Sequence, residues 1–377
     1  MRDLRPDPPA TRARQRRPVA LAPPKPAPSA TIEAVKKTPP TPTRKVVPIA
    51  EAASRRQKKR ARESWAGAMA SVPDDPDEAE NFTMLGNIAL IEGHHEDAVL
   101  AFSRALAIAP HAVSARAGRG RARALLGQHE LALADLDIAL RKARTAALHL
   151  VRAASLAALG LLVDAVKATS RALRVDPKCA QAYYLRAIFG SHVDAEDPQV
   201  TSDLGRAAEL APNVVLYSRE HAKRLMGMEE YDLALADLDK ALSVSPDDPT
   251  LLHMHGVCLK ERAVNAPSGR QVVVGSRWFD EDRIRANEAA LVSLERALVL
   301  APKQGELFEA IVYSIVQARE GMPDEAAYLA ALDRGVAETT NECVYLSVRE
   351  GVRRRRGDIA GADVDKARMK ELGIDRE

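Results

Sequence analysis

The side chains in this sequence that could carry out metal or nucleophilic chemistry are few and stand at unsuitable spacings. Of the nine histidines, only two pairs are close in sequence, His94 with His95 and His253 with His255. Residues two apart on a helix point to different faces, so His253 and His255 are not expected to bind one metal ion together. Neither pair has the HExxH pattern of a zinc site, and the three isolated cysteines form no CxxC motif. The sequence therefore predicts no metal site and no cofactor.

A glycine-rich stretch, GRGRARALLG at residues 118–127, contains the residue types of a phosphate-binding loop. It lacks the GK[ST] ending of such loops, and no strand precedes it. The repeat described below places Gly118 and Gly120 inside a helix. No serine or cysteine stands in a nucleophile elbow. We therefore predict that the protein is not an enzyme.

Composition favours helices, and charge is unevenly distributed along the chain. Hydrophobic residues make up 46% of the 377 residues but aromatic residues only 4%, which points to helices rich in Ala and Leu. Residues 1–65 contain 17 Lys+Arg and 5 Asp+Glu, which leaves 38 basic and 47 acidic residues for the remainder. No run of about 18 apolar residues and no signal-like start are present, so we expect a cytoplasmic protein without a transmembrane segment.

The basic N-terminal part divides into two segments. Residues 1–48 hold 12 of the 23 prolines and predict a disordered, basic, Pro-rich tail. Residues 49–78 predict a basic helix followed by an acidic linker, with Trp65 and Met69 four apart on one helix face. The run RRQKKRAR within this helix has enough charge to bind nucleic acid or an anionic membrane surface.

A repeated phrase organises the rest of the chain. The stretch DLALADLDKALSVSP, residues 232–246, has three near-copies in the sequence. The alanines that close the phrase recur at spacings of 34, 33, 35, 34 and 56 residues, the last being one period plus 22: Ala105, Ala139, Ala172, Ala207, Ala241 and Ala297. A fixed period of this length is typical of stacked helix pairs. In the first unit one helix is expected near Asn81–Glu92 and a second near Glu96–Ile108, separated at Gly93.

The unit resembles the tetratricopeptide repeat (TPR). Seven residues match the consensus of that family in order, and Ala89 departs from it: Phe82, Leu85, Gly86, Ala98, Phe102, Ala105 and Pro110. The resemblance implies an all-α fold, an α-solenoid in which about seven to eight stacked antiparallel helix pairs form a right-handed superhelix. The expected units are 79–112, 113–145, 146–179, 180–214, 215–248, 249–304, 307–338 and 343–373. The sixth unit carries an insertion, 262–284, whose RQVVVGSRWF stretch predicts a short strand pair.

Arginine replaces the consensus leucine of the first helix in two units, at Arg119 and Arg186. A charge at this half-buried place needs a partner. We expect Asp135 and Asp137 to pair with Arg119.

The resemblance also implies a function. Proteins similar to this one bind peptide segments in the groove lined by the first helices, so we expect a non-catalytic scaffold or adaptor for a protein or peptide partner. The alternative is a factor associated with nucleic acid or an anionic surface through the basic tail. The family's two-carboxylate clamp is not expected, because only Asn87 matches among its five positions: Thr83, Asn87, Arg121, Leu150 and Ala154.

Candidate partner-binding residues follow from the groove positions and the insertion. Arg219 and Lys223 stand four apart on the groove side, which suits an acidic peptide or a phosphate group. The full candidate set is Asn87, Arg121, Arg219, Lys223, His253, Lys260, Trp278 and Phe279.

Overall fold

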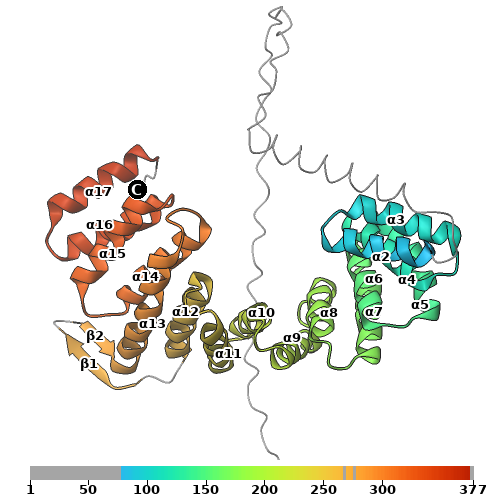
Figure 1. Ribbon diagram of the computed structural model, residues 1–377. Coiled ribbons are helices and arrows are strands. Elements are labelled where there is room, and N and C mark those ends of the chain that lie inside the picture. Colours follow the sequence, from blue (N-terminus) through green and yellow to red (C-terminus); the bar gives the residue numbers. More distant parts are fainter. Residues whose placement is uncertain (1–77, 266–268, 275–276, 374–377) are drawn as a thin grey trace, which may run out of the picture. The chain divides into compact units, whose positions relative to one another are not determined.

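The protein is described by a computed structural model that covers residues 78–265, 269–274 and 277–373. These ranges contain sixteen α-helices and one two-stranded hairpin (Figure 1). The predicted tail 1–48 and the predicted basic helix with Trp65 and Met69 lie outside the described residues. Among the described helices, none is long and apolar enough to span a membrane.

The helices follow one another as antiparallel pairs, each with a first helix (A) and a second helix (B). The first five pairs are α2 (Glu78–Ile91) with α3 (His95–Ile108), α4 (Val113–Leu125) with α5 (His129–Lys142), α6 (Ala146–Ala158) with α7 (Leu162–Val175), α8 (Ala180–Val193) with α9 (Pro198–Leu210), and α10 (Val215–Gly227) with α11 (Tyr231–Val244). The last three are α12 (Pro249–Asn265) with α13 (Glu281–Leu300), α14 (Glu306–Glu320) with α15 (Glu325–Glu338), and α16 (Glu342–Arg355) with α17 (Ile359–Glu371). The architecture is an all-α solenoid, as predicted.

The turn inside several of the pairs uses a left-handed backbone conformation. Gly93, Gly127 and Gly160 provide it, with φ between 75° and 77°. Glycine adopts this conformation at no steric cost, which lets the chain reverse directly after α2, α4 and α6. In the α10–α11 pair the place is taken by Glu229 at φ 63°. A residue with a side chain costs about 1–2 kcal/mol in this region.

Packing joins each B helix to the A helices on both sides of it. Phe102 of α3 is fully buried, and a Cβ placed on Gly86 would lie 2.7 Å from its ring. A Cβ on Gly118 of α4 would collide with the same ring, so both glycines are needed for close approach. The A helices of neighbouring pairs also contact one another, for example α2 with α4 and α12 with α14. Contacts between neighbouring helices therefore run along the whole described array.

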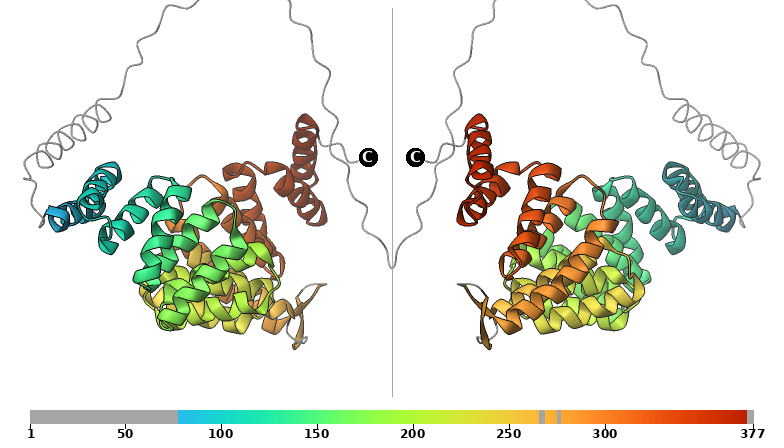
Figure 2. Two further views of the ribbon diagram at one scale, coloured as in Figure 1. Left: turned by 90° about the vertical axis from the view of Figure 1, so that its right-hand side faces the viewer. Right: turned by 90° about the vertical axis from the view of Figure 1, so that its left-hand side faces the viewer.

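The predicted strand pair in the sixth unit is confirmed. Strands β1 (Gln271–Val274) and β2 (Arg277–Asp280) pair antiparallel between α12 and α13, and the hairpin stands out from these helices (Figure 2). Trp278 is 71% exposed, whereas its neighbour Phe279 is buried with the Arg277 guanidinium 5.1 Å from its ring centre. Asp280 ends the hairpin and caps α13 by accepting hydrogen bonds from the first-turn backbone.

Candidate functional site

Pairs of a half-buried arginine with a buried aspartate recur inside the helix pairs. Arg119 of α4 donates two hydrogen bonds of 2.8 Å to Asp135 of α5, and Arg186 of α8 donates bonds of 2.6 and 2.7 Å to Asp203 of α9. The same arrangement joins α16 to α17 and, with histidine in place of arginine, α10 to α11: Arg349 with Asp365 and His221 with Asp237. The predicted pairing of Arg119 with Asp135 is thus confirmed.

The third unit lacks the acidic member of this pair. Ala168 of α7 stands where the second unit has Asp135, so Arg152 of α6 lacks an aspartate at the place where Arg119 has one. Arg152 turns to the preceding unit and donates a 2.6 Å hydrogen bond to Asp137 of α5. The predicted pairing of Arg119 with Asp137 is therefore wrong, because residues two apart on a helix point to different sides, so Asp135 faces Arg119 while Asp137 faces the next unit.

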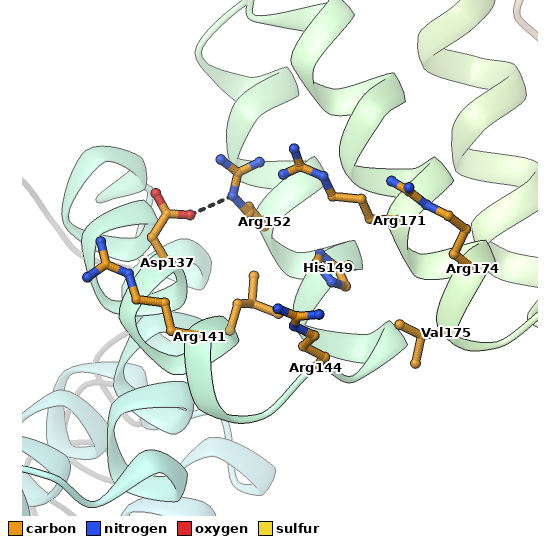
Figure 3. A pocket seen from close by; sticks show the side chains of 9 residues that line it. Asp137, Arg141, Arg144, His149, Arg152, Arg171, Arg174 and Val175 are labelled. Atoms are coloured by element: carbon orange, nitrogen blue, oxygen red, sulfur yellow. Dashed lines mark hydrogen bonds and ion pairs between the residues drawn. The ribbon is translucent and has the colours of Figure 1, made fainter.

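The ion pair of Arg152 with Asp137 lies in a strongly basic pocket, which we call the arginine pocket (Figure 3). It is open to solvent, has a volume of about 640 Å³ and is formed by α5, the α5–α6 connection, α6 and α7. Its lining residues are Asp137, Leu140, Arg141, Arg144, His149, Arg152, Arg171, Arg174 and Val175. Five arginines and one aspartate give the lining a net charge of +4, with His149 neutral.

Four of the five pocket arginines have no acidic partner. Only Arg152 forms an ion pair there; Arg141, Arg144, Arg171 and Arg174 are exposed and form no ion pair or hydrogen bond within the described part of the chain. Two of the four lie in the last turn of a B helix, where the helix dipole favours a cation. The dipole accounts for their position but leaves their hydrogen-bond donors free for a ligand.

His149 lies among these arginines (Figure 3). Its side chain is largely buried, at 8% exposure for the residue, and its Nδ1 atom has no hydrogen-bond partner among the described residues. Burial lowers the pKa of His149, and the charges of the nearby arginines, Arg171 first, lower it further. The pocket thus has a positive potential strong enough to oppose protonation of its own histidine.

Comparisons with known proteins concern the fold. No protein-family model and no curated protein matches the sequence. Among solved structures, the C-terminal part of a TPR repeat-containing protein from Cytophaga hutchinsonii matches with a TM-score of 0.56 and 12% identity, over 70% of this chain and 98% of that one. This protein has the tetratricopeptide fold.

Two further solved structures are similar to part of this chain. PilF from Pseudomonas aeruginosa matches with a TM-score of 0.48 and 17% identity, over 66% of this chain and 99% of its own. YrrB, described as a TPR protein with an unusual peptide-binding site, matches with a TM-score of 0.40 and 20% identity, over 50% of this chain and 96% of its own. At such low identity these matches concern the helical repeat alone.

The structure disperses the predicted site residues over the tetratricopeptide array. Asn87, Arg121 and Lys223 are exposed on the A helices α2, α4 and α10. Arg219 is half-buried, and its guanidinium pairs with Glu220 at 3.1 Å. Trp278 is available at the surface.

Two predicted candidates on α12 face another helix. His253 Nε2 lies 3.0 Å from the hydroxyl of Ser314, and Lys260 donates a 2.5 Å hydrogen bond to Gln317. Both partners belong to α14. These contacts join two A helices of the array, α12 and α14. Phe279 is buried beside α13 and in this way joins the hairpin to that helix.

Sequence reasoning missed the arginine pocket. One signal was available: Arg144 stands where five other units have their closing proline. A second signal was Ala168, which stands where the second unit has an aspartate, because Arg152 then needs an acidic partner from another unit. Neither signal predicts that Arg171 and Arg174 lie near Arg141 and Arg144, because that proximity depends on how the second and third units stack.

Buried histidines should make the array less stable in mild acid. Burial is the first cause that lowers the pKa of His149, His253 and His255 below the ordinary histidine value of 6.5. Below about pH 6.5 the unfolded chain then binds more protons than the folded one, so stability falls as the pH falls. We expect a smaller free energy of unfolding at about pH 5.5 than at about pH 7.5 in urea titrations. His149→Gln should reduce this difference; a difference independent of the three histidines would contradict the assignment.

Proposed function

We propose that the protein is a non-catalytic protein–protein interaction scaffold and that an acidic segment of a partner protein binds over the arginine pocket. The observation that supports this is the set of four unpaired guanidinium groups around one open pocket with a single carboxylate. Guanidinium forks bind carboxylates in a bidentate manner, and arginine is enriched among the residues that dominate interface energies.

Charge repulsion supports binding rather than a purely structural role. Arg171 and Arg174 lie within one turn of α7, and Arg141 in the last turn of α5 is followed closely by Arg144 in the α5–α6 connection, so the pocket concentrates like charges without neutralising them. Like charges three residues apart in one helix, as at Arg171 and Arg174, destabilise that helix by a few tenths of a kcal/mol. An acidic segment would neutralise the four free arginines and turn this repulsion into attraction.

The lining favours an acidic peptide over single-stranded nucleic acid. Sequence-tolerant nucleic-acid grooves combine basic side chains with aromatic rings on which bases stack. No Phe, Tyr or Trp lines the arginine pocket; its apolar members are Leu140 and Val175. A peptide with carboxylates and an aliphatic side chain fits this combination of donors and small apolar surface.

Reversing two pocket charges should weaken binding of an acidic peptide. We expect Arg171→Glu/Arg174→Glu to lower the affinity for a fluorescent Glu-rich peptide at least about tenfold, since two attractions become repulsions. Fluorescence anisotropy at low and high salt measures this, and the wild-type affinity should fall with ionic strength. Far-UV circular dichroism should stay unchanged, because both arginines are exposed and unpaired.

A matched variant separates the two candidate sites. Arg219→Glu/Lys223→Glu makes the same change in total charge on α10, at the place predicted from the sequence. Loss of binding in this variant alone would move the site to α10. Equal binding by both variants, or tighter binding of single-stranded RNA than of the peptide, would contradict the proposal.

A further inference from the structure

Helix α2 exposes an apolar face. Met84 is 57% exposed and Ile88 is 40% exposed, one turn apart on the same side of the helix. Ile91 continues the stripe at 86% exposure. Large apolar residues in a row on one helix face indicate a surface that packs against something.

The repeat shows what normally covers this face. One unit later the equivalents of Met84 and Ile88 are Gly118 and Ala122, which are buried against α3. Two units further on, the equivalent of Ile88 is Phe189, which is buried in a cluster with residues of α7. Every later A helix of the described chain contacts the B helix that precedes it, from α3 with α4 to α15 with α16. Within the described residues α2 has no preceding B helix.

The sequence directly before α2 contains the B-helix pattern. The stretch ARESWAGAMASVP, residues 61–73, has a small residue, a large apolar residue, alanine, a second apolar residue and proline at the spacings of α3. The matching pairs are Ala61 with Ala98, Trp65 with Phe102, Ala68 with Ala105, Met69 with Leu106 and Pro73 with Pro110. In α3 the first four of these positions are all buried.

The connection has a suitable length. Four residues, 74–77, separate Pro73 from α2, and two residues separate Pro110 from α4. A segment with the pattern of a B helix therefore stands one short loop before an A helix that lacks one.

We propose that residues 61–73 form the B half of a further repeat and pack on α2, with Trp65 against Met84 and Ile88. The position of Trp65 corresponds to that of Phe102, whose ring reaches the next A helix at Gly118. The added half-repeat would cover the open end of the array, as terminal repeats of such proteins must. The proposal is independent of the arginine pocket.

The two tryptophans of the full-length protein provide the test. Trp278→Phe leaves Trp65 as the only indole, and Trp65→Phe leaves Trp278, which is 71% exposed, as an internal standard for a solvated indole. We expect the first variant to emit at shorter wavelength and to be quenched several-fold less by acrylamide. Equal emission and equal quenching in the two variants would overturn the proposal.

A double-mutant cycle tests the contact itself. Trp65→Ser and Met84→Ser should each lower the melting temperature by a few degrees, and the double variant should melt close to the single ones because both remove the same contact. Fully additive effects would show that the two residues do not touch. If Trp65 is shielded at high protein concentration but becomes exposed on dilution, a second copy of the chain covers α2. That result would also overturn the proposal.

Discussion

Asp203→Ala should destabilise the array by about 3 kcal/mol, the lower end of the range for breaking a buried ion pair, because it leaves a half-buried arginine without its counter-charge. The Asp203 side chain is 2% exposed and that of Arg186 is 21% exposed. The hydrogen bonds to Asp203 raise the pKa of Arg186 above its usual value. The guanidinium therefore stays charged when its partner is removed, and Gln199 also loses its 2.7 Å bond to the carboxylate.

The matched control comes from the protein's own first unit. Leu85 and Ala101 stand there at the two places that Arg186 and Asp203 occupy in the fourth unit. The double variant Arg186→Leu/Asp203→Ala should recover most of the lost stability, since an apolar pair often replaces a buried ion pair at no cost. Urea titrations of the two variants measure the difference. A double variant no more stable than Asp203→Ala would mean that the destabilisation has another cause.

Phe102→Ala should cost about 3–5 kcal/mol, the range for a buried phenylalanine that leaves a cavity. Its ring is fully buried and fills the space between Gly86 of α2 and Gly118 of α4. Without the ring, two glycines face each other across an empty volume, so three helices lose contact at once. The melting temperature and urea midpoint measure the loss.

Two further variants test whether the glycines serve the ring. Phe102→Leu should cost less than Phe102→Ala, because leucine fills the same place in other units, as at Leu136 and Leu238. Gly118→Ala should destabilise the wild-type protein, since its Cβ would collide with the ring, and should be tolerated in the Phe102→Ala background. Equal effects of Gly118→Ala in both backgrounds would show that the glycine has a different role.

The sequence by itself determined the helix pairs. The period near 34 residues and the alternation of small and large apolar residues permit only one way of burying the apolar stripes, which is against the neighbouring unit. Local signals also sufficed for the strand pair at residues 271–280 and for a partner to Arg119. In each case the information lies within one unit or one turn.

Only the tertiary structure decided which charges remain free. Asp137 and Asp135 are two residues apart and chemically alike, yet one closes an ion pair within its unit and the other reaches Arg152 of the next. Trp278 and Phe279 alternate along one strand, and packing beside α13 decides that Phe279 is buried. The two-residue period of a strand places neighbouring side chains on opposite faces, but it does not determine which face other residues cover.

The arginine pocket is the clearest case of a feature that depends on how the units pack. Its arginines are separated by up to 33 residues, from Arg141 to Arg174, and belong to three helices and a connection. Side-chain spacing along a helix follows from the sequence, whereas the distance between helices of successive units depends on interface residues such as Ala139 and Ala172. The sequence therefore determined that the chain is a repeat array, and the packing of one unit on the next decided where that array gathers unpaired positive charge.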